Sequence, residues 1–333
     1  METTRIADTD LEPTRIGLGT WAIGGWMWGG TDEAQSIATI HAALDRGITL
    51  IDTAPVYGFG ESEELIGRAL ADGGRRRRVV LATKAAIDWT ADHQPFRNAS
   101  AARIEQEAED SLRRLRTDVI DLYQVHWPDP QTPVEETAAA MARLYRDGKI
   151  RAIGVSNFSP AQMEAFRQAA PLHASQPPHN LFERNVEQEI LPYCHKTGIT
   201  TLTYGALCRG LLSGRMRPES QFPGDDLRNI DPKFQPPRFA QYLAAVDRLD
   251  RLAQERYGRR VLHLALRWLL DREGVGIALW GARRPDQLEP VSEVSGWSID
   301  ADAMAEIDRI VADCVTDPVG PEFMAPPEER PAA

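Results

Sequence analysis

The chain has 333 residues and a formal net charge of -11, from 38 lysines and arginines against 49 aspartates and glutamates. This acidic balance argues against a nucleic-acid or anionic-membrane surface, because binding to polyphosphates relies on patches of lysine and arginine. Cys194, Cys208 and Cys314 are widely spaced and form no CxxC pair, which excludes a disulfide framework and a cysteine zinc site. The N-terminal residues form no apolar signal segment, and no run approaches the roughly 18 apolar residues of a membrane span. We therefore expect a soluble cytoplasmic protein.

Short β-rich runs alternate with segments of helical apolar spacing along the chain. The runs lie at 16–19, 48–52, 79–83, 119–125, 150–155, 172–175, 199–203 and 275–280. The helical segments lie at 32–46, 61–71, 99–116, 133–147, 159–169, 185–197, 240–257, 259–271 and 300–313. Eight runs in this alternation predict an α/β protein with a closed (β/α)8 TIM barrel. We expect one barrel domain over residues 1–316 and a Pro-rich tail over 317–333.

Cap residues and one long connection refine this prediction. Asp32, Thr132 and Ser159 precede helical segments and have side chains that are common at helix N-caps. Residues 209–239 are rich in glycine, proline and charge and show no core pattern. Connections of this length are often functional, so we interpret the segment after the seventh strand as a loop over the active face.

Proton-handling side chains stand where successive predicted strands end. Asp52 closes the second run and Tyr57 follows it by five residues, while Lys84 follows the third run and His126 the fourth. All strand C-termini of a parallel barrel open on one face, where catalytic side chains collect. We therefore expect these four residues to lie together.

The four side chains together suit donation of a proton to a carbonyl oxygen. A phenol is a weak acid, with a reference pKa of about 10. We expect the Lys84 ammonium to lower the pKa of Tyr57, Asp52 to keep Lys84 charged, and His126 to orient the substrate oxygen. Reduction of the carbonyl also needs a hydride, which none of these side chains can supply, so a nicotinamide cofactor is indicated.

Other strand ends carry groups that suit such a cofactor. The fifth run ends at Ser156 and Asn157, the sixth at Gln176 and the seventh at Tyr204. Amides suit a carboxamide, and an aromatic ring suits stacking on a flat heterocycle. The eighth run leads into Gly281, Ala282, Arg283 and Arg284, with Gln287 at a helix start. Arginines at a helix N-terminus are a favourable phosphate site.

These blocks resemble the aldo-keto reductases over nearly the whole chain. The matching segments are Gly17-Leu18-Gly19-Thr20-Trp21, Asp52-Thr53-Ala54-Pro55-Val56-Tyr57-Gly58, Gly154-Val155-Ser156-Asn157-Phe158, Tyr204-Gly205-Ala206-Leu207 and Gly210-Leu211-Leu212-Ser213-Gly214. Leu207-Cys208-Arg209-Gly210 and Trp280-Gly281-Ala282-Arg283 make the resemblance greatest to the bacterial general-stress reductases of the family.

The resemblance implies an NADPH-dependent barrel without a Rossmann domain and a tetrad of Asp52, Tyr57, Lys84 and His126, with Tyr57 as general acid. It implies that Ser156, Asn157 and Gln176 hold the carboxamide and that Tyr204 stacks on the nicotinamide. It places Arg283 and Gln287 at the 2′-phosphate and the adenine. The other residues that it assigns to the cofactor site are Gly19, Thr20, Trp21, Asp52, Gly205, Leu207, Arg209, Gly210 and Gly281. The implied reaction is reversible reduction of aldehydes or ketones to alcohols.

Three other functions remain open at this point. Lys84 could form a Schiff base, as desolvated lysines do in barrel aldolases. His126 with Asp52 could ligate a metal, although barrel hydrolases need more ligands than the first strand end offers; we expect no metal. A barrel of this kind could also bind NADPH as a redox sensor that docks on a larger protein and turns over little.

The tryptophans suggest an apolar substrate pocket. Trp21, Trp26, Trp28 and Trp89 lie in the segments after the first and third strands, and Trp127 follows His126. Aromatic side chains commonly wall ligand pockets. The expected partner is a small carbonyl or alcohol substrate, whose identity the sequence does not give. No segment reads as an obligatory apolar interface, so a monomer is the default expectation.

Overall fold

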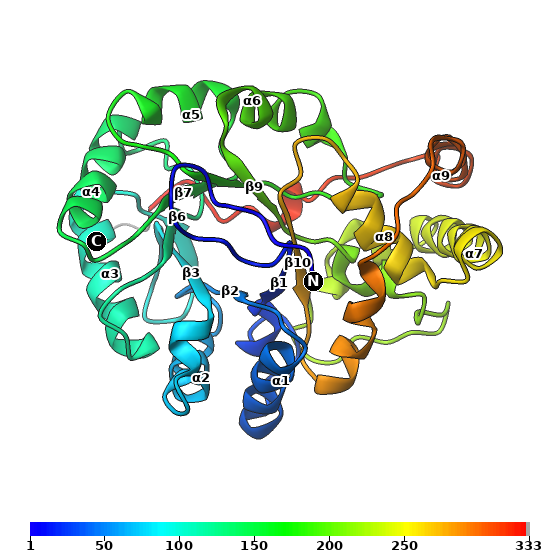
Figure 1. The fold of residues 1–333 in the computed structure, drawn as a ribbon, viewed down its shortest axis with the longest axis horizontal. Coiled ribbons are helices and arrows are strands. Elements are labelled where there is room, and N and C mark those ends of the chain that lie inside the picture. Colours follow the sequence, from blue (N-terminus) through cyan, green and yellow to red (C-terminus); the bar gives the residue numbers. More distant parts are fainter. Residues whose placement is uncertain (331–333) are drawn as a thin grey trace.

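A closed barrel of eight parallel strands lies inside a ring of helices in the computed structural model, which describes residues 1–330 (Figure 1). The order of the strands around the barrel is β1-β10-β9-β8-β7-β6-β3-β2. The strands are β1 (Ile16–Gly19), β2 (Leu50–Asp52), β3 (Val80–Ala85), β6 (Leu122–Val125), β7 (Ile153–Ser156), β8 (Ala174–Gln176), β9 (Thr200–Thr203) and β10 (Ile277–Gly281). The predicted (β/α)8 barrel is confirmed.

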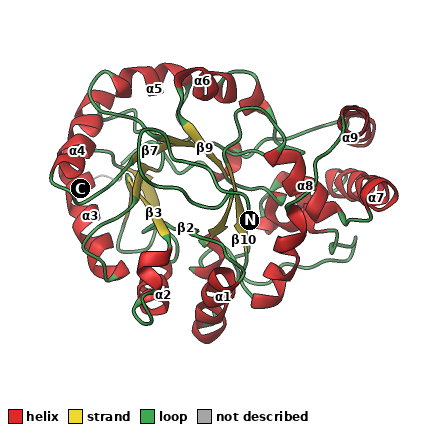
Figure 2. Cartoon of the chain, viewed as in Figure 1, coloured by secondary structure: helices red, strands yellow, loops and turns green. Residues whose placement is uncertain are grey.

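Helices cover the outside of the barrel, and two of them lie further out on one side (Figure 2). The helices are α1 (Glu33–Asp45), α2 (Glu61–Leu70), α3 (Ala101–Leu115), α4 (Val134–Arg146), α5 (Pro160–Arg167), α6 (Ile190–Thr197), α7 (Arg238–Tyr257), α8 (Val261–Leu270) and α9 (Ala301–Cys314). The outer two are α7, which packs on α8, and α9, which packs on α7. A 3-10 helix, η7 (Pro285–Val294), stands after β10 and carries Gln287 in its first turn.

Some local predictions hold and others are wrong. Asp32 and Ser159 cap α1 and α5 through side-chain acceptors, as expected. Thr132 does not cap α4, because the N-cap is Pro133 and the Thr132 hydroxyl donates instead to Asp129 at 2.7 Å. The helix predicted at 185–197 is interrupted: a 3-10 turn, η3 (Asn185–Glu187), precedes α6, which begins only at Ile190.

An antiparallel hairpin of β4 (Ile87–Trp89) and β5 (Pro95–Arg97) stands outside the barrel, directly after β3. The sequence does not predict this hairpin, because two three-residue strands are too short to produce a clear alternating pattern. The hairpin belongs to the face of the barrel on which the strands end.

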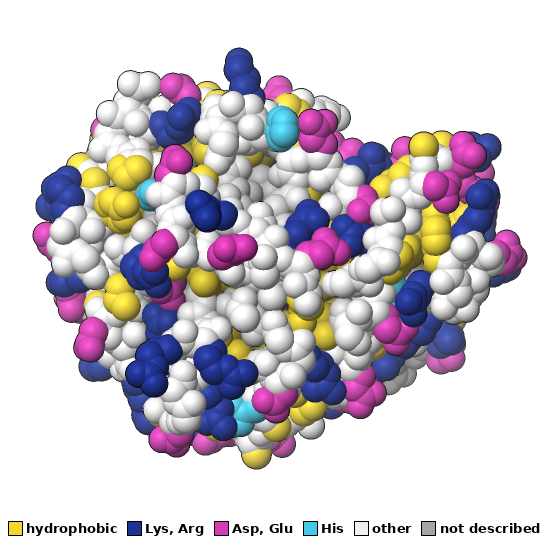
Figure 3. Space-filling model, viewed as in Figure 1, with side chains coloured by type: hydrophobic (Ala, Val, Ile, Leu, Met, Phe, Trp, Pro, Cys, Tyr) yellow, Lys and Arg dark blue, Asp and Glu magenta, His cyan; other side chains and the backbone are white. Residues whose placement is uncertain are grey.

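The opposite face is closed by the N-terminal segment. This segment crosses the barrel in Figure 1, and Ile6 and Leu11 are buried against residues at the barrel floor. The floor residues include Leu50, Val80 and Leu122. Acidic and basic side chains are interspersed over this face (Figure 3). Access to the interior is therefore from the face where the strands end.

The tail after α9 crosses the face on which the strands end. The Lys233 ammonium, from the long loop after β9, donates to the Gly320 carbonyl at 2.9 Å. Further along, Arg97 of β5 donates to the Pro326 carbonyl at 3.1 Å, and Arg330 donates to Asp129 at 2.6 Å. These contacts tie the tail to the long loop and to the hairpin. Residues 331–333 of the predicted tail lie outside the described residues. No helix among residues 1–330 is long and apolar enough to cross a membrane.

Candidate active site

Strand register brings the predicted proton-handling residues to one edge of the barrel. Gly19 of β1 is opposite Asp52, which is opposite Ala82 of β3, and Lys84 is opposite Gln124 of β6. Tyr57 follows β2 in a turn that glycines make possible. A Cβ on Gly24 would lie 2.4 Å from the Tyr57 carbonyl oxygen, so only glycine allows the loop after β1 to approach this closely.

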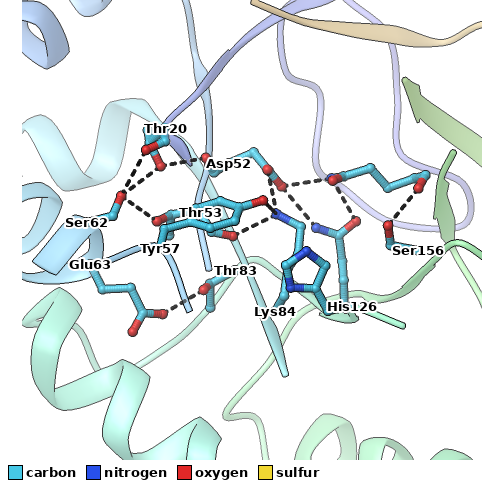
Figure 4. A network of polar contacts seen from close by, with 12 residues as sticks. Thr20, Asp52, Thr53, Tyr57, Ser62, Glu63, Thr83, Lys84, His126 and Ser156 are labelled. Atoms are coloured by element: carbon cyan, nitrogen blue, oxygen red, sulfur yellow. Dashed lines mark hydrogen bonds and ion pairs between the residues drawn. The ribbon is translucent and has the colours of Figure 1, made fainter. Parts of the chain in front are cut away.

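A lysine, a carboxylate and a phenol meet in a chain of polar contacts (Figure 4). The Lys84 Nζ lies 2.7 Å from Asp52 Oδ2, 2.8 Å from the Thr53 carbonyl oxygen and 3.3 Å from Tyr57 Oη. Lys84 is fully buried and Asp52 is 2 % exposed. A buried ammonium is stable when paired and hydrogen-bonded in this way. The contacts hold the ammonium directly beside the phenol oxygen.

Two glutamines complete the environment of Asp52. Its Oδ1 accepts from Gln124 Nε2 at 3.1 Å and from Gln176 Nε2 at 2.8 Å. Gln176 was predicted for the site, but Gln124 was missed. The signal for Gln124 was available: it lies on β6 two residues before His126, which directly follows the strand, and residues two apart share a face. With the Lys84 contact, the carboxylate has three donors and is held in one orientation.

The pKa of Tyr57 is displaced in the opposite direction to the sequence expectation. Burial and then the nearby Asp52 carboxylate raise the pKa of the phenol well above 10.0. Burial lowers the pKa of Lys84 from 10.5, against the opposing effect of Asp52. The expected lowering of the Tyr57 pKa is therefore wrong, because desolvation and the carboxylate outweigh the ammonium. The phenol is protonated near neutral pH.

His126 stands beside the phenol, near Lys84 (Figure 4). Its ring makes an edge contact with the Tyr57 ring, with the centroids 5.8 Å apart. Burial, together with the charge of Lys84, lowers the pKa of His126 well below 6.5. The imidazole is therefore neutral near pH 7 and can donate one N–H to an oxygen atom placed next to the phenol. The sequence-predicted group of Asp52, Tyr57, Lys84 and His126 is brought together.

Amide and hydroxyl groups form a second set at the ends of β7 to β9. The Ser156 hydroxyl donates to the Gln176 carbonyl oxygen at 2.7 Å, and the Asn157 amide donates to the Ser156 hydroxyl at 3.0 Å. The Tyr204 hydroxyl donates to Asn157 Oδ1 at 2.9 Å. Asn157 adopts a φ of 62°, a left-handed conformation that asparagine tolerates better than most residues. These contacts join the four predicted residues into one row beside Asp52.

Asp52 and Tyr57 of the first set and Gln176 and Tyr204 of the second border a cavity of about 670 Å³. The other four members stand behind them and are not part of its lining: Lys84, His126, Ser156 and Asn157. The predicted residues in its lining are Gly19, Thr20, Trp21, Asp52, Tyr57, Gln176, Tyr204, Gly205, Leu207, Arg209, Gly210, Gly281, Arg283 and Gln287. Six arginines line it: Arg209, Arg215, Arg228, Arg260, Arg283 and Arg284. Among residues 1–330, Asp52 is the one acidic residue in the lining. A concentration of cations in a protein of net charge -11 suits a polyanionic ligand.

One wall of the cavity is the segment after β1. Arg283 donates to the carbonyl oxygens of Trp28 and Gly30, both at 2.7 Å. Asp225 of the long loop accepts from the Met27 and Gly29 amides at 2.7 and 2.9 Å. The predicted residue Arg283 thus connects the end of β10 to this segment. In addition, Gln287 Oε1 accepts from the Arg283 amide at 2.7 Å, which fixes the turn after β10.

Arg209 has a different environment from the other lining arginines. Its Nε donates to Asp231 at 2.6 Å, and its Nη2 pairs with Glu183. Lys233 lies 2.8 Å from the same Glu183. These four charges are buried, and three of them belong to the long loop itself. The predicted residue Arg209 therefore lines the cavity while its guanidinium holds the long loop in place.

The predicted tryptophan wall divides into two groups. Trp21 and Trp28 line the cavity, and the Trp21 ring stacks on Tyr57 with centroids 6.0 Å apart. The indole N–H groups of both are buried without an acceptor in the protein. Trp26 and Trp127 pack around Tyr57 with Ala54, Val56, Ile87 and Phe59. Trp89 reaches this group through Phe59, with centroids 5.6 Å apart. The surroundings of the phenol are aromatic.

Arg228 is a cavity residue that sequence reasoning missed. It comes from the long loop, pairs with Asp226 at 2.6 Å and stacks over Phe222, with its guanidinium carbon 4.2 Å from the ring centroid. Its segment shows no strand or helix periodicity, so the sequence carries no signal that would place it. Among the described residues, no group of three or more His, Cys, Asp or Glu side chains is arranged to hold a metal ion.

Residues 15–312 match the family model described as the Aldo/keto reductase family. The chain belongs to this family. It is 63 % identical over 327 residues to aldo-keto reductase YhdN of Bacillus subtilis, which covers 98 % of both chains. It is 36 % identical over 313 residues to the NADH-specific methylglyoxal reductase of Escherichia coli, covering 90 % of this chain and 95 % of the relative.

A solved structure is similar to this aldo-keto reductase over almost its whole chain. The glycerol dehydrogenase AKR11B4 from Gluconobacter oxydans superposes with a TM-score of 0.88 at 54 % identity, covering 97 % of this chain and 99 % of that one. The resemblance seen in the sequence is thus confirmed. Membership of the family makes this aldo-keto reductase an oxidoreductase of carbonyl groups that works with a nicotinamide cofactor and a small-molecule substrate.

Proposed function

We propose that the protein is a cytoplasmic NADP(H)-dependent reductase of aldehydes or ketones, working reversibly, in which Tyr57 is the proton donor. The observation that carries the proposal is the position of Tyr57 Oη, 3.3 Å from the Lys84 ammonium, beside a cavity lined by six arginines. The free cysteines Cys194, Cys208 and Cys314 support a reducing compartment.

The residues around the cavity fit a dinucleotide. The arginines suit its phosphates. The buried indole N–H groups of Trp21 and Trp28 have no acceptor in the protein, and a bound ligand could supply one. Tyr204 would lie against the nicotinamide, and Ser156, Asn157 and Gln176 would hold its carboxamide. Arg283 would hold the 2′-phosphate, and Gln287 would hold the adenine. When bound, the cofactor supplies the hydride that the protein's side chains lack.

The side chains of the tetrad handle the proton. Tyr57 donates its Oη proton to the carbonyl oxygen as negative charge develops there, since the phenol is protonated near neutral pH. Lys84 then stabilises the phenolate from 3.3 Å, and Asp52 holds Lys84 at 2.7 Å. Neutral His126 donates an N–H to the same oxygen and orients the carbonyl toward Tyr57. In the reverse direction the phenolate accepts the proton of the alcohol.

Protonated Lys84, held by a carboxylate and a carbonyl oxygen, is a poor amine nucleophile, which makes Schiff-base chemistry the weaker alternative.

The preference for NADPH is testable by a titration with both cofactors. Trp21 and Trp28 line the cavity, so binding should quench tryptophan fluorescence. We expect tighter binding of NADPH than of NADH, because only NADPH carries the phosphate that suits Arg283. The E. coli relative is named as NADH-specific, which makes the comparison informative. Tighter NADH binding would contradict the cofactor assignment.

The proton donor is testable by Tyr57→Phe. We expect the variant to bind NADPH normally and to lose carbonyl reduction by about 100-fold or more, the usual contribution of general acid catalysis. Methylglyoxal reduction and glycerol oxidation are suitable assays, because two relatives are named for them. Tyr257→Phe is the matched control, since Tyr257 bonds to Asp300 outside the cavity. Full activity in Tyr57→Phe would refute the role of Tyr57, and cofactor binding without turnover in the wild type would favour a redox-sensing barrel.

A further inference from the structure

Lys84 stands just before a sharp change in chain direction. Two residues later, Ala86 has a φ of 76°, a left-handed conformation that is unfavourable for alanine. Ile87 then begins the β4–β5 hairpin. Ala86 is fully buried, so its amide N–H has no access to water and needs a protein acceptor.

The acceptor comes from helix α3. Glu107 Oε2 lies 3.0 Å from the Ala86 amide nitrogen, and Glu107 is 1 % exposed. Its other oxygen, Oε1, accepts from Arg103 Nη2 at 3.0 Å. The same guanidinium reaches forward through Nη1 to Asp88 Oδ1, at 3.1 Å. One carboxylate and one guanidinium therefore hold both the left-handed turn and the first strand of the hairpin.

We propose that Glu107 and Arg103 form a positioning pair that fixes the hairpin against the aromatic surroundings of Tyr57 and thereby sets the affinity for the carbonyl substrate. This inference rests on the proposed reduction of a carbonyl at Tyr57. Neither residue belongs to the predicted site, and neither lines the cavity.

The hairpin connects the pair to the phenol. Ile87, next to Ala86, is a buried member of the apolar cluster around Tyr57. Trp89, two residues on, packs edge-on against Phe59 of the same cluster, and the Arg103 guanidinium lies 5.3 Å from the Trp89 ring centroid. Displacement of the turn would therefore move the side chains that pack around Tyr57, where the carbonyl of the proposed reaction would lie.

Lys84 itself has independent support. Asp52 and the Thr53 carbonyl hold its ammonium at 2.7 and 2.8 Å whether or not the turn is fixed. Loss of the positioning pair should therefore raise KM for the carbonyl and leave kcat nearly unchanged. A raised KM with an unchanged kcat would indicate that the hairpin has moved, whereas damage to the proton-donating group would lower kcat.

The positioning pair also makes substrate affinity sensitive to pH. Burial raises the pKa of Glu107 to about 7, against the attraction of Arg103 and the Ala86 amide. The other titratable groups that face it are Glu63 from α2, which adds to the rise, and Tyr123 from β6. The carboxylate is charged above this pKa and makes the stronger, charge-assisted contacts. Below it, the carboxyl group is neutral and holds the turn less firmly.

The test is Glu107→Gln, which keeps the shape and an acceptor but has no charge. We measure kcat and KM for one aldehyde, at saturating NADPH, from about pH 6 to 8.5. Wild-type KM should rise about fivefold as the pH falls through the Glu107 pKa, a change that corresponds to about 1 kcal/mol. Glu107→Gln should show at every pH the raised KM that wild type reaches only at low pH, and its kcat should stay within about twofold of wild type. The two proteins should converge at low pH.

Glu105→Gln is the matched control, because Glu105 is a half-buried residue of the same helix that pairs with Arg143 and does not contact the hairpin. It should retain the wild-type pH profile. A wild-type KM that does not change with pH, or a Glu107→Gln variant that keeps the pH step, would overturn the proposal.

A second variant covers the case in which Glu107→Gln does not fold. Asp88→Asn removes the charge of the half-buried hairpin residue that pairs with Arg103. It should raise KM about fivefold with kcat retained. Unchanged KM in Asp88→Asn would count against the positioning pair. Failure of this inference differs from failure of the proposed function, because a wild-type protein with no carbonyl turnover would refute the function itself.

Discussion

Tyr57 and His126 are both held in their uncharged forms near neutral pH, and this sets the expected pH dependence of the turnover number. The pKa of Tyr57 is raised by burial and Asp52, and the pKa of His126 is lowered by burial and Lys84. Carbonyl reduction by the proposed mechanism needs the protonated phenol, which is present below its raised pKa. We therefore predict that kcat for reduction varies by less than about threefold between pH 6 and 8.

Alcohol oxidation by the same site should behave differently. In the proposed mechanism, oxidation needs Tyr57 as a phenolate, whose population rises about tenfold per pH unit below the raised pKa. We predict that kcat for oxidation climbs steadily from pH 7 to 10 while kcat for reduction stays level. Stopped-flow single turnovers separate these chemical steps from product release. A flat oxidation profile would mean that the proton goes to a group other than Tyr57.

Lys84 and Asp52 form a buried pair, so the two residues should depend on each other for stability. Lys84→Met leaves the Asp52 carboxylate without its cation, although Gln124 and Gln176 still donate to it. Breaking a buried pair from one side costs about 3 to 5 kcal/mol. We predict that Lys84→Met lowers the free energy of unfolding by this amount, as measured by urea denaturation. The double variant Lys84→Met/Asp52→Asn should recover most of the loss.

Enzyme activity distinguishes the contribution of the Lys84–Asp52 pair to stability from the role of Lys84 in catalysis. The double variant should be as inactive as Lys84→Met, because neither has an ammonium beside the Tyr57 oxygen. Additive losses of stability in the two single variants would show that the 2.7 Å contact contributes little energetic coupling.

Sequence reasoning predicted side chains whose place follows from the ends of strands. Asp52, Lys84 and His126 are such residues, because strand register alone places them on one face. It failed where the answer depends on desolvation. The direction of the Tyr57 pKa could not be read from residue types, since burial outweighs the neighbouring charge. Glu107 was missed for a similar reason: a glutamate in a helix is normally a solvent-facing residue, and here it is 1 % exposed.

At the scale of elements, the regular parts of the chain were predictable and the connections were not. Strand runs and helical spacing gave every barrel strand within a few residues. The β4–β5 hairpin and the start of α6 were missed because their short segments carry no period. The loops fix the cavity walls through single contacts such as Asp225 with the Met27 amide, which no local pattern encodes.

The segment after β1 provides an element-scale prediction about cofactor choice. Arg283 binds the carbonyls of Trp28 and Gly30, and Asp225 binds the neighbouring amides. Arg283→Ala loosens the segment and also removes a cation. We predict that Arg283→Ala weakens NADPH binding by about tenfold or more and NADH binding much less, because a charged phosphate contact is worth about 1.5 to 3 kcal/mol.

Asp225→Ala is the control for this prediction, since it loosens the same segment without removing a cation. It should weaken the binding of NADPH and NADH by similar factors in fluorescence titrations. Equal effects of Arg283→Ala on the two cofactors would mean that Arg283 acts by holding the segment after β1 and does not bind the 2′-phosphate.

At the scale of the whole molecule, a terminal segment of the chain lies across each end of the barrel. The N-terminal segment fills the floor with Ile6 and Leu11. The tail crosses the opposite face, where Met324 lines the cavity and the Phe323 ring lies 5.6 Å from the Arg209 guanidinium. The sequence of the tail does not predict this packing, because the tail contributes backbone carbonyl oxygens, which accept from Lys233 and Arg97 and which every residue type carries.

This arrangement predicts that the tail contributes to both stability and substrate binding. Ending the chain after Thr316 removes the Gly320 acceptor of buried Lys233 and the contacts of Arg330 with Asp129 and Thr132. It also removes Met324 from the cavity wall. We predict a loss of about 2 kcal/mol in the free energy of unfolding, the sum expected for a few partly exposed charged hydrogen bonds.

Kinetics should show which part of the site the tail serves. Asp52, Tyr57 and Lys84 have their contacts with one another below the tail, so kcat should change less than KM for the carbonyl. Ending the chain after Arg330 is the control, because it keeps every tail contact described above. A truncation after Thr316 that matched this control in urea denaturation and in KM would mean that the tail rests on a barrel whose cavity and buried charges are complete without it.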